Sequence, residues 1–351
     1  MERTQMLSWV LLCLSVVLVA ASACAPGTKN GAPTAEVLDL DVIGSYKTDG
    51  CAKDVFVSNS YAYVVVDSFR NESIHIIDVS NPEKPSLVSS YRAFPESPCA
   101  VFVEGSYAYI ADYMTGLQII DVSDPKNPKL VSTYSTGQLV FDVFVKGSLA
   151  YLMDCEGHGL EIVDISEPRM PRQVSRYKTG VSVDSLSVSG RYAYLAGFIP
   201  RVLSDIRPAA MGVLIIDISE AENPTLAGFA VTGNPECTYA EGDYLYVGDA
   251  VSNLKVVDIS NPAKPRLVTT CKLPAMVTGL FVQGKYLFAS CSGVEESSGL
   301  LVMNISNPES PVIVGSYHHA CTGDESVFVV DSYAYVAGSH GLTIIKVSPK
   351  Q

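Results

Sequence analysis

The sequence of 351 residues predicts an all-β fold, namely a seven-bladed β-propeller made of four-stranded antiparallel blades. Three observations support this prediction. An aromatic strand motif occurs seven times, a proline-rich turn motif follows each copy, and an unpaired segment near the N-terminus resembles the strand that the last unit lacks.

The aromatic motif reads YAYVV, YAYIA, LAYLM, YAYLA, YLYVG, YLFAS and YAYVA along the chain. Its copies begin at Tyr61, Tyr107, Leu149, Tyr192, Tyr244, Tyr286 and Tyr333. Large and small residues alternate in each copy, which is typical of a β-strand with neighbours on both faces. We expect the tyrosines to pack in the core and between blades.

The turn motif reads IIDVSNPEKP from Ile76 and IIDVSDPKNP from Ile119, and it recurs in every later unit, ending with the shortened IIKVSP from Ile344. The aspartate before the serine is expected to bind backbone N–H groups of its own turn, because Asp before Ser and Pro commonly does so. In the second unit the four predicted strands are Cys99–Glu104, Tyr107–Asp112, Leu117–Val122 and Lys129–Tyr134. Blades are predicted to start near residues 51, 97, 139, 181, 235, 275 and 322.

The ends of the repeat region predict how the ring closes. The seventh unit stops near Ser348 without a fourth strand, whereas the segment 37–46 contains IGSY, which resembles the VGSY that begins at Val314. Pairing of this N-terminal strand in the last blade would leave no open sheet edge. The propeller is therefore predicted to span residues 37–348.

The first residues predict export. Arg3, an apolar run and the small residues before Cys24 are typical of a signal peptide over residues 1–23. The sequence Ala21-Ser22-Ala23-Cys24 resembles a bacterial lipobox, which implies lipidation of Cys24 and a flexible tether over residues 24–36. Two alternatives stay open, namely simple secretion and an uncleaved membrane anchor.

Charge excludes one class of partner. With 24 basic and 37 acidic residues the chain carries a formal net charge of −13. Nucleic-acid binding requires a basic patch that displaces counterions from phosphates, so no nucleic-acid partner is expected.

The Asp-[Val/Ile]-Ser-x-Pro-x-x-Pro turns, together with the YAYVA strands, resemble the LVIVD-repeat proteins. That resemblance covers residues from about 37 to 348. It implies a β-propeller of an exported or surface protein, and it implies no particular biochemical activity.

Two groups of residues are predicted on the face that carries the loops between blades. The first consists of carboxylates at the mouth of the central channel, Asp54, Asp142, Asp184 and Glu325, supported by the ends of the second strands at Asp67, Asp112, Asp154 and Asp249. They could hold Ca²⁺ or a cationic ligand. Alternatively, each carboxylate caps its own loop and faces water.

The second group contains cysteines and histidines. Cys155, His158, His319 and Cys321 have the side chains that Zn²⁺ or Cu(I) prefers. Alternatively, these cysteines are buried thiols or form disulfides, and a Cys51–Cys321 bridge would lock the ring near its closure. The insertion Phe198–Met211 is expected to carry recognition, as long loops often do.

These observations predict a non-enzymatic envelope lipoprotein, at the outer membrane or cell surface, that binds a protein, polymer or glycan through its loop-rich face. We expect a monomeric propeller without a required cofactor. The alternative is a hydrolase or metal-dependent enzyme that uses the acidic and Cys/His-rich mouth, because propellers host many unrelated chemistries.

Overall fold

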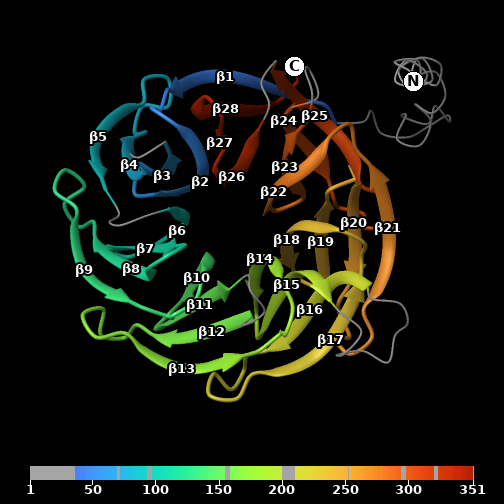
Figure 1. Cartoon of the computed structure of the whole chain (residues 1–351). Coiled ribbons are helices and arrows are strands. Elements are labelled where there is room, and N and C mark those ends of the chain that lie inside the picture. Colours follow the sequence, from blue (N-terminus) through green and yellow to red (C-terminus); the bar gives the residue numbers. More distant parts are fainter. Residues whose placement is uncertain are drawn as a thin grey trace, which may run out of the picture. The chain divides into compact units, whose positions relative to one another are not determined.

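The computed structural model describes residues 36–68, 72–92, 97–154, 159–199, 210–251, 253–293, 298–319 and 323–350. Within these ranges, strands β1 to β28 form seven four-stranded antiparallel sheets that surround a central axis as blades (Figure 1). The seven-bladed propeller predicted from the repeats is confirmed. In the same part of the chain, no helix is long and apolar enough to cross a membrane.

Every blade has the same order of strands from the axis outward. The innermost strands are β2 (Cys51–Ser58), β6 (Pro98–Glu104), β10 (Val140–Lys146), β14 (Val183–Ser189), β18 (Pro235–Glu241), β22 (Met276–Gln283) and β26 (Asp324–Val330). The second strands are β3 (Tyr61–Asp67), β7 (Tyr107–Asp112), β11 (Leu149–Asp154), β15 (Tyr192–Ile199), β19 (Tyr244–Asp249), β23 (Tyr286–Ser292) and β27 (Tyr333–Gly338). The third strands are β4 (Ser73–Asp78), β8 (Gly116–Asp121), β12 (Gly159–Asp164), β16 (Ala210–Asp217), β20 (Asn253–Asp258), β24 (Ser298–Asn304) and β28 (Gly341–Pro349). The outermost strands are β5 (Ser86–Tyr91), β9 (Lys129–Tyr134), β13 (Arg172–Tyr177), β17 (Thr225–Val231), β21 (Arg266–Lys272), β25 (Val312–His319) and β1 (Leu38–Tyr46).

Strand β1 closes the ring. It pairs antiparallel with β28, from Leu38 opposite Pro349 to Tyr46 opposite Leu342, and so becomes the outermost strand of blade 7. The predicted closing strand over residues 37–46 is confirmed. Blade 7 is therefore built from both ends of the repeat region, and β1 covers the edge of β28 that would otherwise lack a partner.

The hydrophobic core lies between blades rather than at the axis. The described part of the chain contains seven clusters of buried apolar side chains, and each cluster draws on two adjacent blades. The alternating strands explain this arrangement, because successive side chains point to opposite faces of a blade and both faces pack against neighbours.

The repeated turn motif serves both its own turn and the preceding blade. Asp78 accepts a hydrogen bond from the backbone N–H of Ser80 at 2.9 Å, and Asp121, Asp164, Asp217, Asp258 and Asn304 do the same in the next five blades. The structural interpretation of these aspartates is confirmed.

The turn also contacts the outermost strand of the blade before it. Ser89 donates a hydrogen bond at 2.6 Å to the carbonyl of Pro125 in the following blade. At the same position of β17 a Cβ on Gly228 would lie only 1.8 Å from the carbonyl oxygen of Pro262. Blades therefore approach so closely here that only small residues fit.

Two faces follow from the antiparallel order of the strands. The mouth face carries the connections between blades and those joining second to third strands. The turn face carries the hairpins joining first to second strands, together with the proline-rich turns. The backbone bond from Val79 to Ser60, at 2.9 Å, holds these two kinds of turn together.

Candidate functional site

Each innermost strand contains a β-bulge at the same place. In the pairing with the second strand, one residue near the mouth face has no partner in the ladder. A bulge bends its strand and changes the direction of a side chain, and bulges are frequent beside functional sites. The skipped residues, called here the bulge ring, are Lys53, Cys99, Phe141, Asp184, Glu236, Thr278 and Glu325.

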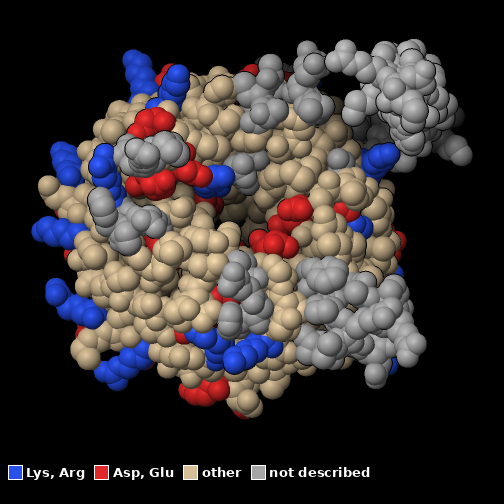
Figure 2. Space-filling view, in the orientation of Figure 1, with Lys and Arg blue, Asp and Glu red and all other residues tan. Residues whose placement is uncertain are grey.

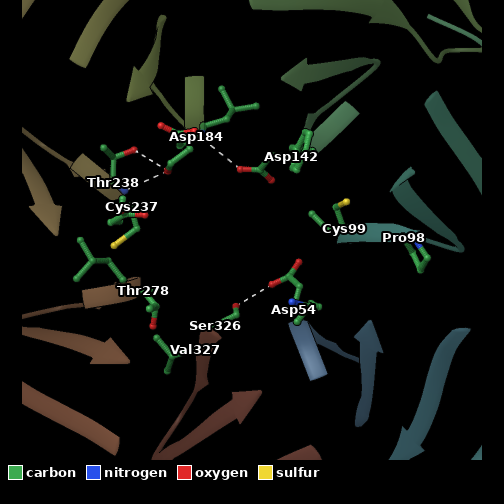
Figure 3. Close-up of a pocket in the computed structure, with 18 of the residues that line it drawn as sticks. Asp54, Pro98, Cys99, Asp142, Asp184, Cys237, Thr238, Thr278, Ser326 and Val327 are labelled. Carbon is green, nitrogen blue, oxygen red and sulfur yellow. Dashed lines mark hydrogen bonds between the residues drawn. The ribbon is translucent and has the colours of Figure 1, made fainter. Parts of the chain in front are cut away.

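The bulge ring surrounds a cavity at the mouth of the channel. Its volume is about 610 Å³, and all seven innermost strands contribute to its wall. Figure 2 shows the hollow at the centre of the molecule with acidic side chains beside it, and Figure 3 shows the lining residues pointing into it from every side. The side chains that the blades contribute to this cavity include basic, acidic, aromatic and thiol groups.

Asp54 lies on the cavity wall one position below the bulge, but its oxygens are occupied. One oxygen accepts hydrogen bonds from Val55 N–H at 2.9 Å and from the Ser326 hydroxyl at 2.7 Å, and the other accepts from Val101 N–H at 2.9 Å. Burial raises the pKa of Asp54, while these hydrogen bonds act to lower it. Asp54 thus connects the blade on each side of its own.

Asp142 repeats the two backbone hydrogen bonds of this arrangement two blades further on. It accepts from Val143 N–H at 2.8 Å and, across the blade interface, from Leu186 N–H at 3.2 Å. Burial, and after it the negative charge of Asp54, raise the pKa of Asp142 to about 7. This carboxyl group therefore titrates near neutral pH.

Asp184 and Glu236 differ from these two carboxylates because both belong to the bulge ring and neither makes a hydrogen bond or ion pair to any other described residue. Asp184 is exposed and Glu236 is half-buried. Burial raises the pKa of Glu236, as do the neighbouring charges of Asp184 and Asp249. Two adjacent carboxylates without a counter-ion attract a positively charged group.

The opposite side of the mouth has different chemistry. Lys53 pairs with Asp67, with 3.7 Å between Nζ and the carboxylate oxygen. The Tyr113 and Phe141 rings lie edge to face with 5.0 Å between their centroids, and Phe141 is 36% exposed. An exposed aromatic face in an acidic cavity can also receive a cation, through the ring quadrupole.

On the turn-face side of the cavity, aromatic rings from six of the innermost strands form a collar. The collar comprises Phe56, Phe102, Phe144, Tyr239, Phe281 and Phe328, whose neighbouring centroids lie 4.5 to 5.5 Å apart. In blade 4 the corresponding residue is Ser187, which is 3.1 Å from the Thr238 hydroxyl. A second cavity of about 510 Å³ lies beyond the collar, towards the turn face, and Phe56, Phe102 and Phe144 form part of its wall.

Buried polar side chains support the loops of the mouth face from below. Asp112 and Asp249 are fully buried at the ends of second strands, and each accepts hydrogen bonds from backbone N–H groups of its own loop. Lys255 forms an ion pair with Asp249. Burial alone would raise the pKa of Asp249, but hydrogen bonds from Lys255 and Asn253 lower it below its ordinary value. The expectation that these aspartates cap their loops is confirmed, but the expectation that each faces water is wrong for Asp112 and Asp249.

The predicted mouth carboxylates come together in part. Asp54, Asp142 and Asp184 all line the cavity. Glu325 occupies the bulge of β26, and only its backbone position is described. The sequence prediction missed Glu236, although it occupies the same position as Asp184 in the following blade, three residues before the collar residue.

The predicted Cys and His cluster lies largely outside the described residues. Cys155, His158 and Cys321 fall there, as does the lipidation candidate Cys24, and His319 is placed only as the last residue of β25. The Cys51–Cys321 disulfide and the Zn²⁺ or Cu(I) site therefore stay predictions. Among the residues that are described, no three His, Cys, Asp or Glu side chains are grouped so that they could hold a metal ion.

Three other cysteines belong to the core. Cys237, Cys271 and Cys291 pack in the apolar cluster between blades 5 and 6. The predicted recognition insertion is also shorter than expected, because Phe198 pairs with Met211 and Ile199 with Ala210 in the β15–β16 ladder. The ends of that insertion extend the hairpin, and residues 200–209 lie outside the described part.

Comparisons with known proteins agree with the repeats. A family model described as LVIVD repeat matches residues 49–93, 97–136, 139–179, 180–198, 239–272, 276–319 and 324–350. No curated protein matches the chain. Among solved structures, the crystal structure of the computationally designed Ika8 protein is similar over 86% of this chain and 98% of that one, with a TM-score of 0.60 and 9% identity. At that identity the likeness concerns the fold alone.

Proposed function

Because the chain belongs to the LVIVD-repeat family, whose repeats here build a scaffold, we propose that it is a non-enzymatic binding protein whose ligand site is the channel mouth. The ligand is a protein, polymer or glycan that carries basic groups. The proposal includes export and anchoring through lipidated Cys24 at the outer membrane or cell surface. The observation that carries it is the adjacent pair Asp184 and Glu236, which faces a cavity without a counter-ion among the described residues.

The carboxylates at the mouth are of two kinds: some hydrogen-bond to neighbouring blades, and others are available to bind a ligand. In both Asp54 and Asp142, one carboxylate oxygen accepts a hydrogen bond from the backbone N–H of the next residue, and the other accepts one from a backbone N–H of the following blade. Asp184 and Glu236 project from bulges, which separates them from the hydrogen-bond ladder. A basic group entering the mouth would relieve the repulsion between these two carboxylates and gain attraction to both.

Binding of an oligolysine peptide tests this proposal, with a neutral oligosaccharide and an oligoglutamate peptide as comparisons. We expect the purified full chain to bind oligolysine, and we expect salt to weaken this binding because the carboxylates lie near solvent. The double change Asp184→Asn with Glu236→Gln should weaken oligolysine binding by about tenfold, which corresponds to about 1.4 kcal/mol.

The matched control is Glu83→Gln with Glu309→Gln, which removes the same formal charge from exposed turns of the turn face. Equal weakening by both double variants would indicate only a general charge effect and would contradict the proposed site. If the neutral oligosaccharide bound more tightly than oligolysine, and neither double variant changed its affinity, the carboxylate pair would not be the ligand site.

Hydrolytic chemistry at the same mouth is the second candidate. One observation favours it: the pKa of Asp142, raised by burial to about 7, suits a general base or acid at neutral pH. A screen of the full chain against ester, glycoside and peptide substrates tests this candidate. Turnover that Asp142→Asn abolishes would support it, whereas turnover that this variant leaves intact would assign the activity elsewhere.

A further inference from the structure

The way β1 closes the ring determines where the N-terminal segment leaves the propeller. Leu38, the first residue of β1, pairs with Pro349, the last residue of β28, at the turn-face end of blade 7. Next to this pair, the carbonyl of Val37 accepts a hydrogen bond from Lys350 N–H at 2.8 Å. Tyr46, at the other end of β1, lies opposite Leu342 on the mouth side. The strand therefore runs from the turn face to the mouth face.

A polar contact holds the beginning of this segment against the turn face. Glu36 accepts hydrogen bonds from Lys285 Nζ and from the Tyr286 hydroxyl, both at 2.6 Å. Lys285 lies in the hairpin between β22 and β23, which is one of the hairpins of the turn face. These hydrogen bonds, from Lys285 and then Tyr286, lower the pKa of Glu36. The chain thus leaves the ring at the end opposite the cavity mouth.

The tether is short compared with the ring. Residues 25–35 lie between Cys24 and Glu36. A flexible chain of this length has a root-mean-square span of roughly 18 Å, and the innermost strands, at about 3.3 Å per residue, are roughly 20–25 Å long. Because the average span is shorter than the innermost strands, a lipid on a tether that leaves the turn face lies on average nearer to that face than to the mouth face.

We propose that the propeller stands with its turn face towards the membrane and holds its mouth away from it. This inference rests on the anchoring through Cys24 proposed above. Its consequence for the ligand is specific. The basic group that enters the mouth belongs to a molecule arriving from the aqueous side, and not to a lipid headgroup of the membrane that carries the anchor.

The test places one fluorescent probe on each face of the full lipidated chain in vesicles. Met114 lies between β7 and β8 on the mouth face and is 55% exposed, whereas Met170 lies between β12 and β13 on the turn face and is 58% exposed. A clickable amino acid replaces one or the other, and a nitroxide on the lipid headgroups quenches the probe according to its distance. We expect a larger loss of emission at position 170 than at position 114.

Equal losses at the two positions, or a larger loss at position 114, would overturn the inference. Inserting about 30 Gly and Ser residues after Ala35 supplies a control, because the longer coil spans roughly 35 Å and should bring the two losses closer together.

Fractionation separates failure of the orientation from failure of the anchor. If Cys24→Ser were released into the soluble fraction but the wild-type chain showed equal quenching at both positions, the anchor would be supported and only the proposed orientation would be refuted. Equal membrane association of the wild-type chain and Cys24→Ser would sink the proposed anchoring, and this inference with it.

Discussion

Replacing Asp142 should change how the stability of the propeller depends on pH. Burial raises the pKa of this carboxyl group from 3.8 to about 7 in the folded protein. The folded state therefore keeps a proton that the unfolded chain has already lost between these two values. The stability due to this proton is present at low pH and is lost as the pH rises towards 7.

The size of the effect follows from the two pKa values. Between pH 5 and pH 8 the wild-type chain should lose about 2.5 kcal/mol of unfolding free energy through this group, at about 1.36 kcal/mol per pKa unit. Asp142→Asn stays neutral, so its unfolding free energy should lack this part of the pH dependence. Urea denaturation of both proteins at pH 5, 6, 7 and 8 measures the difference between the two slopes.

In Asp142→Asn the asparagine oxygen still accepts a hydrogen bond, but its NH₂ group faces a backbone N–H donor. This unfavourable contact changes the unfolding free energy by the same amount at every pH. The two proteins are therefore compared by the slope of unfolding free energy against pH. Asp124→Asn is the control. Asp124 lies in an exposed turn, and its hydrogen bonds from Asn127 and Lys126 lower its pKa, so it stays ionised throughout this pH range. Parallel slopes for wild type and Asp142→Asn would refute the argument that burial keeps Asp142 protonated.

Three further predictions concern close packing and buried groups elsewhere in the ring. Gly228→Ala should destabilise the protein by about 2 kcal/mol, because the new Cβ would overlap the carbonyl of the next blade's turn. Gly242→Ala should destabilise it less, because the positive φ at this glycine is the only obstacle to a side chain there. Thermal unfolding of the two variants checks this order. Lys255→Met should cost about 3 kcal/mol in denaturant unfolding, because Asp249 would lose its cation while fully buried, and a loss below about 1 kcal/mol would contradict this role. Burial, and then nearby carboxylates, raise the pKa of the Cys99 thiol to about 12. At pH 7.5 this thiol should therefore react with a disulfide reagent on the order of 1000-fold more slowly than an ordinary thiol. A faster reaction, followed by mass spectrometry, would contradict this.

The fold could be predicted because its signals repeat. One strand motif and one turn motif each occur seven times, and together they predict the architecture. The IGSY segment predicts the closing strand, which is β1 paired with β28. The role of Asp78 could also be predicted, because its partner is Ser80, two residues away in the same turn. Local chemistry of this kind is visible in a sequence.

The site was harder to predict because its contacts join residues that are distant in the chain. Asp54 looks like an available carboxylate until Val101, in the next blade, proves to be its donor. Glu236 could have been found only by aligning the blades on the collar residue and comparing the position three residues earlier, because a bulge has no motif of its own in the sequence. That Ser187 occupies the seventh position of the aromatic collar is visible only when the other six residues are seen together.

The bulges have a consequence for how this protein can evolve. Asp184 and Glu236 have no ladder partner and line an open cavity, so replacing either of them disturbs neither a sheet nor the packing between blades. Blades 4 and 5 thus each offer one position where mutation is nearly free of structural penalty, and both positions border the same cavity. Relatives with the same ring could therefore acquire new ligands by point mutation, one blade at a time, without first having to stabilise a new fold.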